Sequence, residues 1–544
     1  MTDLLPPATL MPMLAAFDAG RDVFLSKLSG LWPEIAMLIG ALACLFTGLS
    51  PNPTVRKTLT PWIAGAALVA AAVITLVVGQ GRSAEAGMAS AMGIGGFEPF
   101  IKLAVAGVGL ILLLVAVNQP NQLRQNAIAD AAKRFEPGDA IRGEFFAFFL
   151  FSLTGVMMTA GANDLVWLFL ALELTSLPTY VLVATSRDRI EAQESAVKYF
   201  FLGALAAAVF LYGFTLVYGA TGFTDLASIA EHVRVAGVSP MMMAGVILAI
   251  LGICFKIAAF PMHFYAADVY QGAATPVTAF LAFVPKTAGF AALILLLATV
   301  RPLPGLLVGL LVVIAIVTMT LGNVLALLQD NVKRVLAYSS IAHSGYLLVG
   351  LTAGFAGDLA PGGPMSNGLA AVLFYLVAYA TGTIGSFAIF GCVSRDGREI
   401  ESYDDIAGLR RRRPLLGWVL LVSVISLLGL PPLVGFVGKL QLIGSAFGAG
   451  LVVLVIALVI NSAISAGYYL KIASVVFFGT SRHTLDDIPS TARRVGAAAA
   501  AILAIALGLL GNFLIDYAHR SILPPGDPAV VETLPTPPAE GEAS

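Results

Sequence analysis

The chain has 544 residues, of which 58% are hydrophobic and only 12% charged, and its mean hydropathy is +0.90. Soluble domains carry roughly twice that share of charged residues, which excludes a string of soluble domains. A net charge of −1 offers no basic surface for nucleic acid. Cys44, Cys254 and Cys392 lie far apart in or beside apolar runs, as expected for buried thiols rather than for a disulfide framework or a metal site.

Apolar runs follow one another along the chain with short connections. A membrane helix needs roughly 20 apolar residues, and a backbone in lipid must satisfy its own hydrogen bonds. The expected helices cover residues 31–48, 61–79, 98–117, 143–162, 163–186, 194–218, 241–264, 275–299, 302–328, 333–355, 368–394, 413–445, 451–478 and 493–515. We therefore predict an all-α polytopic membrane protein with about fourteen transmembrane helices. No signal peptide is recognisable, so the first helix is expected to be retained.

Lysine and arginine are distributed unevenly over alternate connections. One set of loops holds 19 of them, and the other set, together with both termini, holds 6. Basic loops stay on the cytoplasmic side, so both termini are expected on the opposite side. The stretch 521–544 is rich in proline and acidic residues and is expected to be a disordered tail. The polar connection 395–413 is expected to form a short interfacial helix or a protein contact.

Six lysines fall inside the apolar runs. A charge at the bilayer centre costs at least about 2.5 kcal/mol, so such residues are usually functional or paired. Lys102 and Lys471 are expected to snorkel to an interface. Lys198 lies close to a helix end, where snorkelling and a functional role are both open.

Four ionisable residues lie too deep to snorkel: Glu173, Lys256, Lys286 and Lys439. One ion pair with the glutamate leaves two of these lysines unpaired. A buried unpaired ammonium gives up its proton more readily than one in water, because burial disfavours the charged form. This property suits proton translocation. His343, in the middle of its run, fits either a hydrogen-bonded packing residue or a proton carrier.

Prolines interrupt two of the helices that carry these lysines. Pro261 follows Lys256 by five residues, and Pro431 and Pro432 precede Lys439. A proline cannot donate a hydrogen bond to the carbonyl four residues before it. Broken helices with a charge at the break let water and ions reach membrane depth. These residues are therefore the predicted broken-helix positions.

The two breaks also predict an internal duplication of about five helices. Their lysines are 183 residues apart. The expected parts, in chain order, are 1–142 with three helices and a loop, 143–299 with the first repeat, 300–478 with the second repeat, 479–520 with the last helix, and the tail 521–544.

Four stretches then carry a family resemblance. They read ALELTSLPTYVL, FKIAAFPMHFYAADVYQGAATPVTAFLAFVPK, GNVLALLQDNVKRVLAYSSIAHSGYLLVGL and GLPPLVGFVGKLQL. Together they closely resemble the subunit N family of bacterial respiratory complex I, whose mitochondrial counterpart is NADH dehydrogenase subunit 2. The likeness runs from about residue 140 to 480. It implies an antiporter-like fold with two inverted five-helix repeats, each with a broken helix, in the membrane arm of the proton-pumping NADH:quinone oxidoreductase.

The same resemblance implies the site residues. The family couples a glutamate to a lysine in its first half-channel, followed by a central lysine and a lysine on the second broken helix. The implied proton-translocation residues are Glu173, Lys198, Lys256, Lys286, His343 and Lys439, with His263 as a further candidate.

The resemblance implies no cofactor or metal in this chain, because FMN, iron–sulfur clusters and quinone belong to other subunits. The implied partners are neighbouring antiporter-like and small membrane-arm subunits in a bacterial inner membrane. Two alternatives remain. One is a subunit of a multisubunit sodium/proton antiporter, which shares the glutamate–lysine pattern, although YQGAATPVTAF looks most like subunit N. The other is a scaffold with inert charges.

Overall fold

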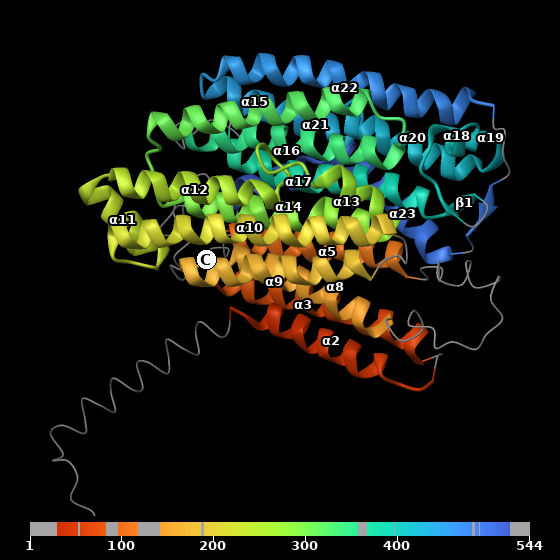
Figure 1. Cartoon of the computed structure of the whole chain (residues 1–544), viewed down its shortest axis with the longest axis horizontal. Coiled ribbons are helices and arrows are strands. Elements are labelled where there is room, and N and C mark those ends of the chain that lie inside the picture. The colour runs from red at the N-terminus through yellow and green to blue at the C-terminus, as the bar shows by residue number, and fades with distance from the viewer. Residues whose placement is uncertain are drawn as a thin grey trace, which may run out of the picture.

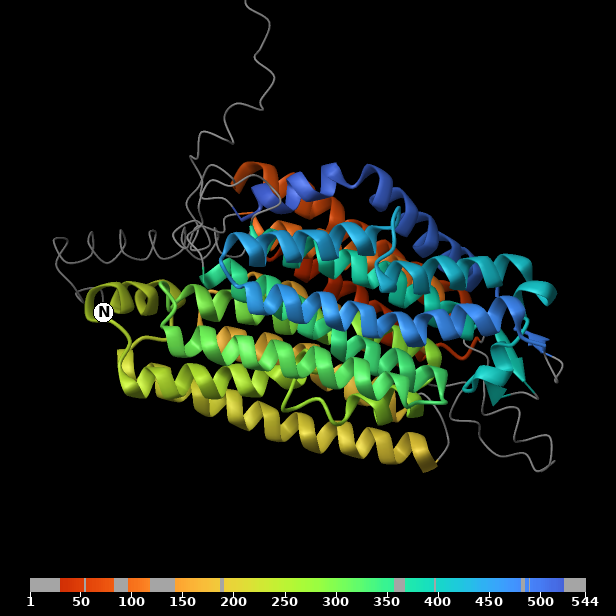
Figure 2. The same cartoon turned by 90° about the horizontal axis from the view of Figure 1, so that it is seen from above.

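A computed structural model describes residues 30–52, 55–82, 96–117, 142–185, 190–356, 367–395, 398–480, 485–488 and 490–522. Figures 1 and 2 show its long helices side by side along one direction. The first helices are α2 (Trp32–Gly48), the short π-helix η1 (Val55–Leu59), α3 (Thr60–Arg82) and α5 (Phe97–Ala116). The predicted tail lies outside the described residues from 523 onward.

The middle of the chain forms two groups of helices. The first comprises α8 (Arg142–Ala160), α9 (Leu165–Ala184), α10 (Ile190–Thr221), α11 (Leu226–Ala236), α12 (Pro240–Lys256), α13 (Ala266–Gly272) and α14 (Thr275–Ala298). The second comprises α15 (Gly305–Leu327), α16 (Val332–Ala356), α17 (Gly368–Phe390), α20 (Pro414–Leu428), α21 (Val434–Gly448) and α22 (Val452–Phe478). The last helices are α23 (Thr491–Leu510) and α24 (Asn512–Arg520).

The number of membrane crossings agrees with the prediction. Eleven of the described helices are long and apolar enough to cross a membrane. Of the shorter apolar helices, α2 stands alone, α12 is continued by α13, and α20 is continued by α21. Counting each broken pair once gives fourteen crossings. The fold is therefore the predicted all-α polytopic one.

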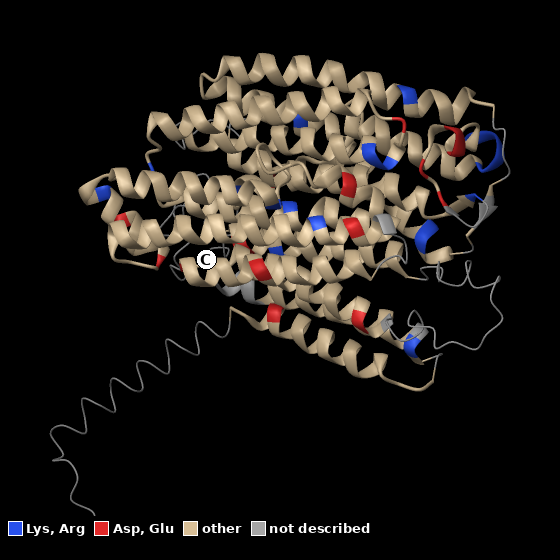
Figure 3. Ribbon diagram, in the orientation of Figure 1, with Lys and Arg blue, Asp and Glu red and all other residues tan. Residues whose placement is uncertain are grey.

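Three helices form the centre of the molecule. Every residue in the spans of α14 and α17 is buried by the protein, as is 94% of the span of α16. By contrast, only 33% of the spans of α10 and α22 is buried. Figure 3 shows that charged residues gather mainly at helix ends, with a few midway along helices. A polar group on a central helix is thus surrounded by other side chains rather than by lipid.

Both predicted helix breaks are present. The helix α12 ends at Lys256, and the carbonyl freed by Pro261 belongs to Ile257. The hydroxyl of Ser344 on α16 donates a hydrogen bond to that carbonyl. The second break separates α20 from α21, with Gly429 at a φ of +85°. The backbone groups left unpaired by proline are thus met by side chains inside the protein.

The two halves of the second broken helix pack closely through Gly435. A Cβ atom built there would lie 1.7 Å from the carbonyl oxygen of Ser426. We expect Gly435→Ala to separate α21 from α20 at a cost of about 1–3 kcal/mol and to lower the amount of folded protein in the membrane. Gly448→Ala in the same helix is the control, because nothing lies within 4 Å of its Cβ position. Equal amounts of the two variants would contradict the prediction.

The connection 395–413 forms a small cap on the chain's own helices. Strands β1 (Val393–Arg395), β2 (Arg398–Glu399) and β3 (Asp486–Asp487) pair antiparallel in the order β2-β1-β3. Two four-residue helices follow, α18 (Tyr403–Ile406) and α19 (Leu409–Arg412). The Glu399 carboxylate accepts hydrogen bonds from the backbone N–H of Thr275 at 3.2 Å and from Lys333. One carboxylate therefore caps the start of α14 and neutralises a buried lysine at the start of α16.

Candidate functional site

The first element of the site is a buried ion pair between α9 and α12. Nζ of Lys256 lies 3.0 Å from Oε1 of Glu173 and donates a second hydrogen bond to Oγ of Ser176 at 2.5 Å. The lysine side chain is 1% exposed and that of the glutamate 17%. The structure thus joins the two residues that the sequence predicted to couple, although they lie 83 positions apart.

Lys286 on α14 is bound by uncharged groups. Its Nζ donates hydrogen bonds to the backbone carbonyl of Ser340 at 2.6 Å and to its Oγ at 2.9 Å. The ring of Tyr379 lies 4.2 Å from the ammonium, and its hydroxyl donates to the same Oγ at 2.7 Å. Within the described ranges no carboxylate forms an ion pair with Lys286. Its charge is therefore only partly compensated.

The broken end of α12 is connected to Lys286 through α16. Ser344 donates to the carbonyl of Ile257, and its hydroxyl also lies 3.3 Å from the carbonyl of Ser340. On the other side, a Cβ atom built at Gly289 of α14 would lie 3.1 Å from Cβ of Lys256. One turn of α14 separates Gly289 from Lys286. The two lysines are therefore neighbours across a short polar stretch of α16.

His343 lies at the centre of a ring of tyrosines. Its Nδ1 is 2.8 Å from the hydroxyl of Tyr375, and its Nε2 is 3.0 Å from the hydroxyl of Tyr469. The rings of Tyr379 and Tyr346 lie at centroid distances of 5.0 and 5.4 Å. A neutral imidazole has one donor and one acceptor nitrogen, and a hydroxyl can fill either role. Both ring nitrogens of His343 therefore face a group that can give or take a proton.

The last lysine closes the second helix break. Nζ of Lys439 donates to the carbonyl of Leu428 at 2.7 Å and to Oγ of Ser462 at 2.9 Å, and lies 4.9 Å from the ring of Tyr346. Leu428 lies four residues before Pro432, which cannot donate a hydrogen bond to its carbonyl. A Cβ at Gly429 would lie 2.8 Å from Cδ of this lysine. A side chain at position 429 would therefore push against this lysine.

We call the resulting arrangement the buried line. It runs through the centre of the protein from α9 to α21, and it consists of Glu173, Lys256, Ser344, Ser340, Lys286, Tyr379, His343, Tyr346 and Lys439. The four serine and tyrosine members were not predicted. A signal was present, because Ser340, His343 and Ser344 recur at spacings of three and four and so share one helix face.

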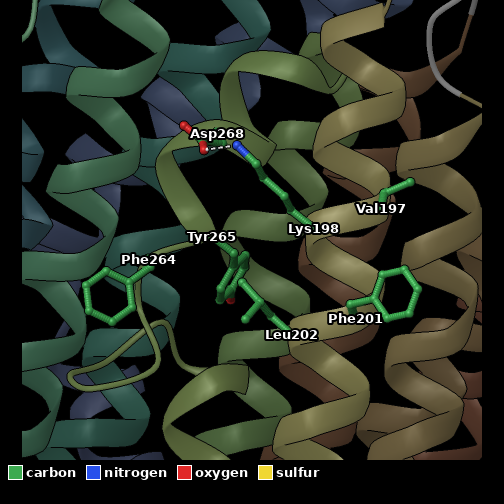
Figure 4. Close-up of a pocket in the computed structure, with 7 residues that line it drawn as sticks. All are labelled: Val197, Lys198, Phe201, Leu202, Phe264, Tyr265 and Asp268. Carbon is green, nitrogen blue, oxygen red and sulfur yellow. Dashed lines mark hydrogen bonds and ion pairs between the residues drawn. The ribbon is translucent and has the colours of Figure 1, made fainter.

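Two predicted residues lie apart from the buried line. Lys198 is 43% exposed and pairs with Glu194 at 2.8 Å and with Asp268 of α13 at 2.9 Å. It borders a surface pocket of about 460 Å³ (Figure 4). His263 is buried in the loop between α12 and α13, and its Nδ1 has no hydrogen-bond partner among the described residues.

The snorkelling expectation is wrong for Lys102 and stays a prediction for Lys471. The side chain of Lys102 is 3% exposed and pairs with Glu34 and Glu98. Glu34 belongs to α2, and the sequence could not show that α2 packs beside α5. The side chain of Lys471 is 46% exposed, 3.7 Å from Asp330.

Two broken helices, each with a buried lysine beside the break, define an antiporter-like membrane protein. Residues 162–465 match the family model described as NADH:quinone oxidoreductase/Mrp antiporter, TM. The chain is 40% identical to NADH-quinone oxidoreductase subunit N of Trichlorobacter lovleyi, over 70% of this chain and 77% of that one. It is 34% identical to the subunit N of Rhodospirillum rubrum, over 90% and 96%. The chain belongs to the NADH-quinone oxidoreductase subunit N family.

Comparison with solved structures gives the same fold. A chain of respiratory complex I from Thermus thermophilus superposes with a TM-score of 0.70 at 31% identity, covering 89% of this chain and 98% of that one. Chains of an archaeal membrane-bound sulfane sulfur reductase (TM-score 0.74, 24% identity, 93% and 100% covered) and of the Mrp complex from Dietzia (0.73, 21%, 93% and 98%) share the fold.

Proposed function

We propose that this chain is a proton-translocating membrane-arm subunit of NADH:quinone oxidoreductase, and that its protons move along the buried line. The observation that carries the proposal is the alternation of buried lysines with hydroxyl and imidazole groups from one helix break to the other. FMN, iron–sulfur clusters and quinone would be bound by partner subunits. The energy for proton translocation would come from NADH oxidation in those partner subunits.

In this mechanism the Glu173–Lys256 pair sets the first step. Weakening the pair, by a conformational or electrostatic change in a neighbouring subunit, makes Lys256 give up its proton toward Ser344, Ser340 and Lys286. His343 then carries the proton from Lys286 to Lys439. The proton leaves the protein on the external side. Moving one charge against 100 mV costs about 2.3 kcal/mol. A change of that size lies within what breaking one buried ion pair can supply.

The distribution of charge supports an orientation. Arg410, Arg411 and Arg412 belong to α19 of the cap. The cap lies where α14 and α16 begin, because Glu399 binds Thr275 and Lys333 there. Basic loops favour the cytoplasm, so this end would face the cytoplasm and both termini the periplasm of a bacterial inner membrane. Neighbouring antiporter-like and small subunits of the membrane arm would be the partners.

Lys256→Ala tests the proposed function. In inverted membrane vesicles that carry the variant, NADH-driven acidification and NADH oxidation are both expected to fall while the assembled complex persists on native gels. Unchanged pumping and oxidation would contradict the proton route. Sodium-driven proton exchange without any link to NADH would instead indicate an antiporter subunit.

Lys198→Ala is expected to have a smaller effect in the same assay. An exposed ion pair contributes up to about 1 kcal/mol, or about fivefold in a rate, and Lys198 lies outside the buried line. A loss as large as that of Lys256→Ala would instead place Lys198 on the main proton route. Glu231→Gln is a control, because Glu231 forms a surface ion pair with Arg234 on α11.

A further inference from the structure

A second buried charge cluster lies outside the buried line, where α2 and α5 begin. Nζ of Lys102 is 2.7 Å from Oε1 of Glu34 and 2.6 Å from Oε1 of Glu98. It also donates to the backbone carbonyl of Gly30 at 3.0 Å. Among the described residues neither carboxyl oxygen of Glu34 has a hydrogen-bond partner, so its contact with Lys102 is an ion pair only. The cluster precedes residues 162–465, which match the family model.

The cluster carries one negative charge that its own lysine does not balance. Two carboxyl groups face a single ammonium. The side chain of Glu34 is 3% exposed, and its Oε2 is buried without a hydrogen-bond partner within the described part of the chain. A buried ionised oxygen without a donor is costly. Protonation of one carboxyl group leaves one carboxylate paired with one ammonium and removes the excess charge.

Neighbouring helices do not supply the missing positive charge. The described acidic, basic and histidine side chains on the helices packed against α2 and α5 are Arg56 of η1, Glu144 of α8, Lys286 of α14, Arg493 and Arg494 of α23, and Asp516, His519 and Arg520 of α24. Among the described residues, none of these contacts Glu34, Glu98 or Lys102. Arg493 binds the carbonyl of Val115, thirteen residues along α5 from Lys102, which is about 20 Å of helix.

Access to the cluster differs between its two acids. Glu98 stands in the first turn of α5 and its side chain is 27% exposed, whereas Glu34 and Lys102 are sealed. A Cβ atom built at Gly161, at the end of α8, would lie 3.1 Å from Oε1 of Glu98. A larger residue at 161 would therefore crowd this carboxyl group. Glu98 is therefore the residue of the cluster that is accessible from outside the protein.

We propose that Glu34, Glu98 and Lys102 form a proton-binding site that holds one exchangeable proton between the two carboxyl groups. The proton comes from water at the membrane face where α2 and α5 begin, binds a carboxylate oxygen through Glu98, and returns by the same way. On the orientation proposed above, this face is the periplasmic one, into which protons are released. The site is separate from the buried line and does not depend on it.

Infrared difference spectra of the purified, intact complex test this site. Spectra recorded between mildly alkaline and mildly acidic buffer are expected to contain the C=O band of one protonated carboxyl group that is lost in Glu34→Gln and in Glu98→Gln. Glutamine copies the uncharged form, so assembly is expected to persist. Glu231→Gln, which removes a surface carboxyl group, is the matched control and is expected to keep the band. If one cluster variant fails to accumulate, the other gives the same comparison.

An unchanged band in both cluster variants would overturn the proposal, because both carboxyl groups would then stay ionised beside Lys102. Spectra that follow sodium concentration at constant pH would also overturn it, in favour of a metal cation. The Lys256→Ala complex is expected to keep the band even if it no longer pumps. Failure of the site and failure of the proton route can therefore be told apart.

Discussion

Replacing Lys286 by methionine is expected to lower proton pumping and NADH oxidation together by more than about tenfold, since a positioned proton-transfer group contributes about 100-fold or more. Methionine fills similar space but carries no proton. Lys286 is only 2% exposed and has no carboxylate partner among the described residues. Removing its charge therefore also removes the cost of burying an ammonium. Folding should therefore tolerate the change while transport fails.

Inverted vesicles would be assayed for acidification and for NADH oxidation, with the complex quantified in the same membranes. Lys471→Met is the matched control: the same substitution on α22, at a half-exposed lysine whose nearest acid is 3.7 Å away. Equal activity of the two variants would remove Lys286 from the proton route. Loss of the complex in Lys286→Met alone would mean that the lysine is needed for folding.

Replacing Glu173 by alanine is expected to abolish most pumping for a different reason. It leaves Lys256 buried with Ser176 as its remaining side-chain partner. Breaking a buried ion pair from one side costs about 3 kcal/mol or more, and a group in that position loses its charge instead of unfolding the protein. The lysine would then no longer hold the proton that the cycle must release.

Two further variants separate charge from shape at this pair. Glu173→Gln keeps a hydrogen-bond acceptor without the charge, so it should pump as poorly as Glu173→Ala. Glu173→Asp keeps the charge on a shorter side chain and should recover part of the activity. Ser176→Ala, which removes the uncharged partner, should lower pumping least. A glutamine variant as active as the wild type would show that the charge of Glu173 is not used.

Features that depend on a single helix could be predicted from the sequence. Chain order, crossing number and both breaks follow from apolar length and from the inability of proline to donate. Depth within a run singled out Glu173 and three lysines, and the family resemblance implied that Lys256 is the lysine coupled to Glu173. The boundaries between the two repeats stay a prediction.

What the sequence could not show depends on how helices pack. Lys102 was expected at an interface because its acid Glu34 lies 68 residues away on another helix. The contacts between His343 and its tyrosines could not be predicted either, since Tyr375 and Tyr469 lie 32 and 126 positions from it in the sequence. Serines inside membrane helices are ambiguous, because they often bond to the carbonyl one turn before them, as Ser176 does with Leu172.

If protons pass through His343, its two hydroxyl contacts fix the order in which the ring can bind and release them. With the proton on Nδ1, the ring donates to Tyr375 and accepts from Tyr469, and with the proton on Nε2 these directions are reversed. A proton that enters through one nitrogen and leaves through the other converts the first arrangement into the second. The next proton cannot follow until the ring and both hydroxyls have turned back. In the proposed route, this single side chain would therefore pass protons one at a time.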